Sequence, residues 1–208
     1  LEQGILILTG GPGTGKTTTL NAIIRLLQEA GERVFLAAPT GRAAKRMSEV
    51  TGEEAKTIHR LLQVDWDEKA NPVFTRNERN PLECDCLVVD ELSMVDAYVF
   101  ESLLRALPFS CRLVLVGDND QLPSVGAGNV LGDLIASGLF PTVQLKEIFR
   151  QSQESLIVMS AHRIVEGKLP DLRRHDSDFF FLPQEDPQKA AQLIVSLCSV
   201  RLPRSYGY

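Results

Sequence analysis

Short apolar runs alternate along the chain with segments long enough to form helices. The runs lie at Ile5–Leu8, Val34–Ala38, Leu87–Val89, Leu113–Val116 and Val143–Leu145. Continuous apolar runs of this length are typical of strands that are buried on both faces, and parallel strands need helical crossovers between them. The pattern therefore predicts an α/β fold with a mainly parallel sheet flanked by helices.

Two of the intervening segments carry apolar residues at helical spacing. The stripes are Leu20, Ile23, Ile24 and Leu27 in the first segment, and Ala43, Ala44, Met47 and Val50 in the second. The first segment has a stop signal at Gly31, because glycine is favoured just past a helix end. We interpret both stripes as core-facing surfaces rather than as parts of a site.

The apolar periodicity lapses between Val64 and Leu82. Asn71-Pro72 is a turn signal there, and Val73-Phe74 is a short extended piece. This pattern fits a hairpin insertion and a solvated loop equally well, so both alternatives stay open.

The C-terminal part predicts one strand and one helix. The strand is expected at Phe179–Leu182. The helix is expected from Asp186-Pro187 through about Val200, because aspartate is favoured as an N-cap and proline in the first turn.

The segment Gly10-x-x-x-x-Gly15-Lys16-Thr17 fits the P-loop pattern, between a predicted strand and a predicted helix. Glycines let backbone N–H groups converge on phosphate, and the helix N-terminus adds its positive dipole end. Lys16 would reach the β- and γ-phosphates, and the Thr17 hydroxyl would bind Mg²⁺. The predicted nucleotide-binding residues are Gly11, Pro12, Gly13, Thr14, Gly15, Lys16, Thr17 and Thr18.

Two further motifs follow predicted strands. Asp90 and Glu91 close the run Leu87–Val89, which we expect to lie next to the P-loop strand. Asp90 would then bind Mg²⁺, and Glu91 would orient and deprotonate a water. An idle acidic pair is disfavoured at the end of an apolar strand. Gln121 follows the next run, and its amide can donate to a γ-phosphate or accept from the attacking water.

Composition narrows the class of protein. The 208 residues carry a net charge of -5, which argues against a protein that coats DNA passively. This charge is weaker evidence against a motor protein, because a motor can bind only a few phosphates in one local groove. No apolar run is long enough to span a membrane, and we expect a cytoplasmic protein without a membrane partner. The cysteines fit reduced core thiols, with a Cys84-Asp85-Cys86 metal site as the alternative.

Taken together, the motifs resemble the first motor domain of a superfamily 1 DNA helicase, most closely of the RecD-like, 5′-to-3′ branch. The similar segments are GGPGTGKTTT at 10–19, APTGRAAKRM at 38–47, TIHRLL at 57–62, VVDELSMVD at 88–96, VGDNDQLPSVGAGNVL at 116–131 and LKEIFRQ at 145–151. The resemblance extends through about Leu172. It implies a RecA-like P-loop NTPase domain at 1–172, in which 64–82 resembles a strand-separating pin, and the truncated start of a second motor domain at 173–208.

The resemblance also implies roles for individual residues. Lys16, Glu91, Gln121 and Arg150 would be catalytic, with Gln121 sensing the γ-phosphate and Arg150 stabilising transition-state charge; Thr17 and Asp90 would bind Mg²⁺. The implied cofactors are ATP and Mg²⁺. The implied DNA-binding residues are Pro39, Thr40, Arg42 and His59.

The residues themselves add some support for a DNA groove. Arg42, Lys45 and Arg46 share a predicted helix after a strand end, and Phe74 with Arg76 offers stacking plus charge. For His59, a structural role is an equal alternative.

The resulting hypothesis is an ATP-dependent DNA helicase motor domain, which couples hydrolysis to translocation on single-stranded DNA and to unwinding at duplex junctions. Partners in a helicase–nuclease complex are also implied. The fragment alone is expected to be weakly active or inactive. The alternatives are a nucleotide-gated ATPase switch that never translocates and a small-molecule kinase, although Asp90, Glu91 and Gln121 suit water as the acceptor.

Overall fold

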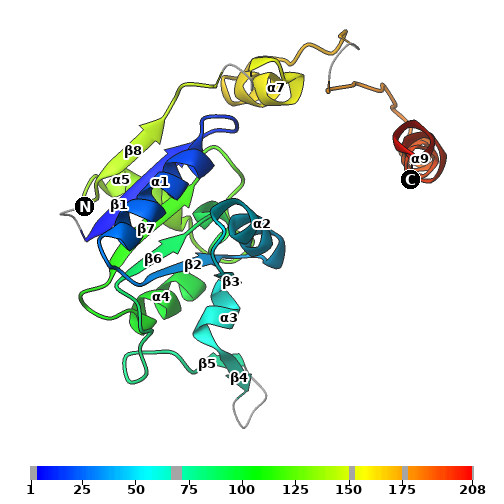
Figure 1. The fold of residues 1–208 in the computed structure, drawn as a ribbon. Helices are drawn as coiled ribbons and strands as arrows, with labels where there is room; N and C mark the ends of the chain where they lie inside the picture. The colour runs from blue at the N-terminus through cyan, green and yellow to red at the C-terminus, as the bar shows by residue number, and fades with distance from the viewer. Residues whose placement is uncertain (1–3, 67–71, 150–152, 175–177, 208) are drawn as a thin grey trace. The chain divides into compact units, whose positions relative to one another are not determined.

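The computed structural model describes residues 4–66, 72–149, 153–174 and 178–207 (Figure 1). The chain separates into two compact units, 1–154 and 155–208. The candidate site lies wholly in the first unit. The domain boundary that we expect at 172/173 stays a prediction.

A six-stranded parallel sheet forms the centre of the first unit, with strand order β3-β2-β6-β7-β1-β8. The strands are β1 (Ile5–Gly10), β2 (Val34–Ala38), β3 (Ala55–Thr57), β6 (Cys86–Val89), β7 (Arg112–Gly117) and β8 (Thr142–Leu145). All but β3 contain an apolar run that predicted a strand, so the α/β fold with a mainly parallel sheet is confirmed. The short β3 pairs with β2 through Leu36 and Ala55, and its composition carries no strand signal.

One detail of the predicted strand order is wrong. We expected the strand ending at Asp90 to neighbour the P-loop strand, but β7 lies between β6 and β1. Leu115 of β7 is in register with Ile7 on one side and with Val89 on the other. Strand order depends on which strands pair across the sheet, and an apolar run carries no information about its neighbour.

Helices cover both faces of the sheet, and alternate strand residues face each layer (Figure 1). On one face, α1 (Lys16–Glu29) and α2 (Gly41–Thr51) pack with Cys86 and Val88. On the other, α3 (Ile58–Leu62), α4 (Ala97–Ala106) and α5 (Val130–Ser137) pack with Leu87 and Val89. This two-sided burial explains why the strands read as continuous apolar runs.

The hairpin alternative for residues 64–82 is favoured by a separate two-stranded antiparallel sheet. Its strands are β4 (Val64–Trp66) and β5 (Pro72–Phe74), with Val64 in register with Phe74. The connecting residues 67–71 lie outside the described part of the chain. Two backbone bonds, from the N–H of Thr75 to the carbonyl of Gln63 and from the N–H of Arg76 to the carbonyl of Leu62, extend the pairing to the end of α3.

The regular structure described in the second unit is helical. The unit contains α7 (Leu156–Val165), α8 (Pro187–Ser196), the π-helical turn η2 (Leu197–Arg201) and α9 (Leu202–Tyr206). The described segments between α7 and α8 have no regular structure. The predicted start of α8 is confirmed, because the Asp186 side chain accepts hydrogen bonds from the N–H groups of Gln188 and Lys189. The helical path continues past the predicted end at Val200.

The strand expected at Phe179–Leu182 is wrong, since these residues have no regular structure. Three of the four, Phe180, Phe181 and Leu182, are exposed. An apolar run needs a neighbouring strand to become part of a sheet, and none pairs with it among the residues described here. No helix in the described ranges is both long and apolar enough to cross a bilayer.

The cysteine segment is part of the core rather than a metal site. The Sγ atoms of Cys84 and Cys111 lie 3.6 Å apart, and burial raises the pKa of the Cys86 thiol to about 12. The Asp85 carboxylate instead accepts hydrogen bonds from the backbone and side chain of Arg33. Within the described ranges, no three His, Cys, Asp or Glu side chains form a metal-binding cluster.

The central strand β7 gives a test of the fold. Leu115 is 1% exposed and Leu139 is 80% exposed. We expect Leu115→Ala to lower the free energy of unfolding by about 2–5 kcal/mol, because it leaves a cavity between the two helical layers. Leu139→Ala removes the same atoms from a solvated position and should cost less than about 0.5 kcal/mol. Urea denaturation followed by circular dichroism measures both; equal losses would contradict the described packing.

Candidate active site

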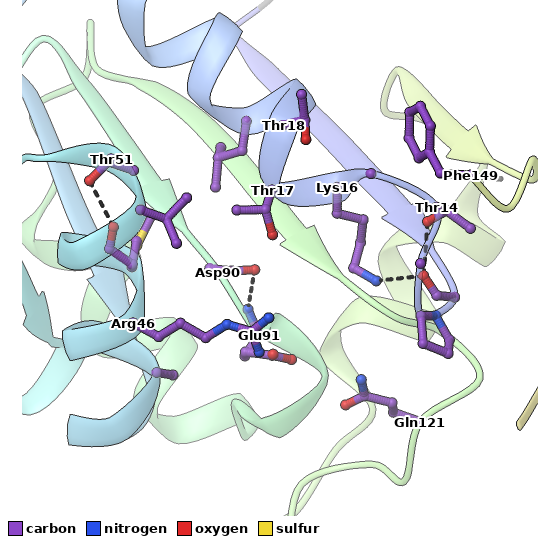
Figure 2. Close-up of a pocket in the computed structure, with 18 residues that line it drawn as sticks. Thr14, Lys16, Thr17, Thr18, Arg46, Thr51, Asp90, Glu91, Gln121 and Phe149 are labelled. Atoms are coloured by element: carbon purple, nitrogen blue, oxygen red, sulfur yellow. Dashed lines mark hydrogen bonds between the residues drawn. The ribbon is translucent and has the colours of Figure 1, made fainter. Parts of the chain in front are cut away.

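A pocket of about 770 Å³ opens at the edge of the sheet where β1, β6, β7 and β8 end (Figure 2). Parallel strands bring their carboxyl ends to one edge, so loops that are distant in the sequence meet there. The predicted residues that line it are Gly11, Pro12, Gly13, Thr14, Gly15, Lys16, Thr17, Thr18, Asp90, Glu91 and Gln121. The structure thus brings together all predicted nucleotide, metal and catalytic residues that it describes.

The loop between β1 and α1 has the geometry of an anion cradle. Gly13 and Gly15 have φ angles of 74° and 85°, in the left-handed region that favours glycine. The Thr14 hydroxyl donates to the carbonyl of Gly11 at 2.8 Å and stabilises the turn. No side chain caps the start of α1, so the first N–H groups of this helix are available to phosphate.

The ammonium group of Lys16 lies within this loop. Its Nζ donates to the carbonyl of Gly10 and, at 3.0 Å, to the carbonyl of Gly11. Figure 2 shows the side chain folded back along the loop rather than extended into solvent. This places a positive charge beside the open N–H groups of α1, which is the arrangement that phosphate binding requires.

Phe149 closes one side of the cradle, although sequence reasoning did not select it as a site residue. A Cβ atom added to Gly15 would lie 2.2 Å from a ring carbon of Phe149. The backbone N–H of Phe149 also donates to the carbonyl of Gly13 at 3.0 Å. Its only sequence signal was its place before Arg150, and Arg150 itself lies outside the described residues, so its catalytic role stays a prediction.

Asp90 and Glu91 lie across the pocket from the loop. Burial raises the pKa of Asp90, while the N–H of Glu91, which donates to Asp90 Oδ1 at 2.9 Å, opposes the shift. Burial and then the charge of Asp90 raise the pKa of Glu91. Lys16 and Arg46 act in the opposite direction on both groups. Glu91 has a φ of 54°, which is uncommon outside glycine and frequent at functional sites.

The donor set fits a magnesium ion. Figure 2 shows the Thr17 hydroxyl pointing toward the Asp90 carboxylate, and both side chains line the pocket. Mg²⁺ prefers oxygen ligands and usually binds through one or two protein groups together with phosphate oxygens and water. A half-buried carboxylate with a raised pKa also gains from a nearby cation.

Gln121 reaches the pocket from the turn after β7. Asp118, which is 3% exposed, stabilises this turn through two hydrogen bonds. Its carboxylate accepts one from the N–H of Asp120, and its backbone carbonyl accepts one from the N–H of Gln121. The exposed side chain of Gln121 is therefore carried on a fixed backbone at the rim. This position suits contact with a terminal phosphate or a water.

Helix α2 forms the remaining wall, which the sequence did not predict. Its lining residues are Ala43, Arg46, Met47, Val50 and Thr51. Ala44 and Met47 are buried as expected, so the interpretation of the stripe as core-facing is only partly right. Arg46, which we grouped with the DNA-groove cations, instead lies at the pocket. In the sequence, Arg46 is marked only by its position four residues after Arg42 on the same predicted helix, which does not indicate a place in the nucleotide pocket.

The predicted DNA-binding residues lie outside this pocket. Pro39, Thr40 and Arg42 follow β2, and His59 lies on α3 after β3, the parallel neighbour of β2. Both segments therefore leave the same edge of the sheet. Arg42 and His59 are exposed, whereas the Thr40 side chain caps α2 by accepting from the N–H of Ala43 at 3.2 Å.

A row of aromatic rings continues from His59 toward the hairpin. The ring centroids of His59 and Phe74 lie 5.7 Å apart, and those of Phe74 and Tyr98 lie 6.1 Å apart. Phe74, Arg76 and Tyr98 also line a second cavity of about 510 Å³. Arg76 is bonded to Asn80 Oδ1 and to the carbonyl of Pro81, so it also holds the turn. Tyr98 carried no sequence signal because only folding brings α4 beside β5.

The contact between Gly15 and Phe149 gives a test of the cradle. We expect Gly15→Ala to weaken nucleotide binding at least about tenfold, because the new methyl group must displace the Phe149 ring. Gly31→Ala is the matched control, since Gly31 has a similar φ of 83° but nothing within 4 Å of an added Cβ. Titration with a fluorescent ATP analogue measures both affinities. Equal weakening would mean that backbone strain, rather than the pocket, is responsible.

Comparison with known proteins agrees with this geometry. The chain is 43% identical over 166 residues to the ATP-dependent RecD2 DNA helicase of Deinococcus radiodurans, covering 80% of this chain and 22% of that protein. It is 46% identical over 158 residues to the RecBCD enzyme subunit RecD of Mycolicibacterium smegmatis, covering 65% and 28%. The chain thus spans between about a fifth and a third of the length of these curated relatives.

Solved structures give the same fold. Bacteroides Pif1 bound to single-stranded DNA matches 94% of this chain and 53% of that chain with a TM-score of 0.57 and 22% identity. A Pif1 structure concerned with unwinding at forked duplex DNA matches 81% and 45% with a TM-score of 0.56 and 25% identity.

The sequence profile of the AAA domain family matches residues 1–127. This range contains the P-loop, Asp90, Glu91 and Gln121, which are the groups that meet at the pocket. The RecA-like fold and the RecD relatives agree with the same assignment. The chain therefore belongs to the AAA domain family, and its sequence is similar to those of the RecD relatives.

Proposed function

We propose that the chain is the first motor domain of an ATP-dependent DNA helicase, which couples ATP hydrolysis to translocation on single-stranded DNA and to duplex unwinding. The observation that carries the proposal is the convergence of Lys16, Glu91 and Gln121 on one pocket. Arg42 and His59, which are predicted to bind DNA, are exposed outside this pocket. The name of the Deinococcus relative supports it. A duplex junction at the hairpin and partners in a helicase–nuclease complex belong to the same proposal, the latter supported by the RecBCD subunit.

ATP binding would use the loop and the start of α1. The N–H groups of the loop and the ammonium of Lys16 would bind the β- and γ-phosphates. Thr17 and Asp90 would hold Mg²⁺, which when bound neutralises phosphate charge. Phe149 would limit the cradle on the side of β8, because its backbone is bonded to Gly13.

Hydrolysis would use Glu91 as the general base. Its carboxylate would accept a proton from the attacking water, and its raised pKa makes it a stronger base than an exposed glutamate. Gln121 would orient that water or contact the γ-phosphate. Arg150 would stabilise the transition-state charge, as the resemblance implies.

DNA would lie along the sheet edge beyond β2 and β3. Thr40, Arg42 and His59 would contact the strand there, and Phe74 would offer a ring for base stacking. A net charge of -5 is compatible with this role because only a local groove needs to be positive. ATP turnover that does not respond to single-stranded DNA would favour a nucleotide-gated switch instead.

The first test of this function concerns the phosphate site. We expect Lys16→Ala to weaken Mg·ATP binding at least about 100-fold, because it removes a charge-assisted contact from a preorganised cradle. Lys56→Ala is the control, since Lys56 lies on β3, is paired with Glu54 and does not line the pocket. Isothermal titration calorimetry on the 208-residue chain measures both, and unchanged affinity of the Lys16 variant would refute the assignment.

A second test separates the two carboxylates in a polypeptide that carries this chain and a second motor domain. We expect Glu91→Gln to keep Mg·ATP affinity within about threefold while lowering kcat by about 10²–10⁴-fold, because the amide cannot accept the proton. We expect Asp90→Asn to raise the Mg²⁺ concentration needed for half-maximal activity. Steady-state kinetics with varied Mg²⁺ decide the matter. If the two variants behave alike, the division of roles is wrong.

A further inference from the structure

Arg46 lies at the nucleotide pocket on a helix that is held firmly in place. It shares the pocket-facing side of α2 with Ala43 and Val50, at spacings of three and four residues. The Thr40 side chain caps the start of α2, and Asn21 of α1 donates to the carbonyl of Val50 at 3.2 Å near its end. The backbone that carries Arg46 is therefore fixed relative to the P-loop helix.

The guanidinium of Arg46 is available to act on the catalytic carboxylates. Its neighbour Lys45 is paired with Glu49 at 3.8 Å, whereas Arg46 forms no ion pair among the residues that the structure describes. Figure 2 shows the Arg46 side chain extending from α2 toward Glu91. The other pocket cation, Lys16, is held on the opposite side by the carbonyls of Gly10 and Gly11. From the side of α2, Glu91 therefore faces Arg46.

The Glu91 side chain needs such a partner. Its backbone is fixed by the bond from its N–H to Asp90 Oδ1 and by its left-handed φ. Among the residues that the structure describes, none forms a hydrogen bond or ion pair with the carboxylate itself, and the adjacent Asp90 carboxylate repels it electrostatically. A cation on the α2 wall would favour rotamers that direct the carboxylate into the pocket and away from Asp90.

We infer that Arg46 is a positioning residue for hydrolysis, which holds the Glu91 carboxylate toward the pocket across from the P-loop. The inference rests on the proposed function, because it takes Glu91 as the general base. Arg46 also lies one helical turn after Arg42, which we propose contacts DNA.

The experiment uses a polypeptide that carries this chain and a second motor domain, with saturating single-stranded DNA. We expect Arg46→Ala to lower kcat by about 10–100-fold while KM for ATP and the dissociation constants for nucleotide and DNA stay within about twofold. Arg46→Lys should recover part of the rate, because lysine keeps the positive charge but has a shorter side chain. Arg25→Ala, which removes an exposed arginine from α1 outside the pocket, should leave kcat unchanged.

A double-mutant cycle shows whether Arg46 acts by positioning Glu91 or contributes to hydrolysis independently of Glu91. In single-turnover hydrolysis, adding Arg46→Ala to Glu91→Gln should lower the residual rate by less than about twofold, since Arg46 acts through Glu91. An equal loss in both backgrounds would overturn the inference. So would a raised KM at unchanged kcat, which would indicate direct contact with the nucleotide. If Arg46→Ala lowers the melting temperature, Arg46→Gln and Arg46→Lys provide the same comparison.

The outcomes also separate this inference from the proposed function. Wild-type hydrolysis by Glu91→Gln would refute the role of Glu91 and the inference with it. An inactive Glu91→Gln beside a fully active Arg46→Ala would refute only the role of Arg46.

Discussion

Parallel pairing of β6, β7 and β1 is the constraint on which the site depends. Because the three strands run in the same direction, their carboxyl ends lie at one edge of the sheet. The P-loop, the pair Asp90 and Glu91, and the turn that carries Gln121 each follow one of these ends. Burial of the strands by helices on both faces stabilises the pairing, so the same apolar residues that form the core also position the chemistry.

Close packing of the loops then brings these groups within reach of one another. Glycines allow two of these close approaches: a Cβ at Gly10 would lie 2.7 Å from the carbonyl oxygen of Leu145, and one at Gly117 would lie 2.7 Å from a methyl carbon of Leu131. The first contact joins the P-loop to β8. The second lets α5 pack against the end of β7. A side chain at Gly10 would have to displace backbone, whereas one at Gly117 would have to displace the Leu131 side chain, so the small size of both residues links local sequence to the packing around the pocket.

The electrostatic balance of the pocket follows from this packing. Two adjacent carboxylates are partly removed from water, which raises the pKa of each and makes them costly to hold as a charged pair. Lys16 from the P-loop and Arg46 from α2 offset this cost from opposite walls. A site that binds a triphosphate and a divalent cation gains from the arrangement, because the cation replaces the missing hydration of the acids.

By itself, the sequence determined the fold class, the strands with continuous apolar runs, the P-loop and the acidic pair that follows β6. These features are local, since spacing, glycines and strand ends are read directly along the chain. Only the tertiary structure decided that β7 lies between β1 and β6, that β3 forms and that 179–182 is not a strand. It also decided that Arg46 and Phe149 line the nucleotide pocket and that Tyr98 lines the second cavity. Each of these depends on contact between segments far apart in the chain, where pairing partners and neighbouring helices, rather than local pattern, set the outcome.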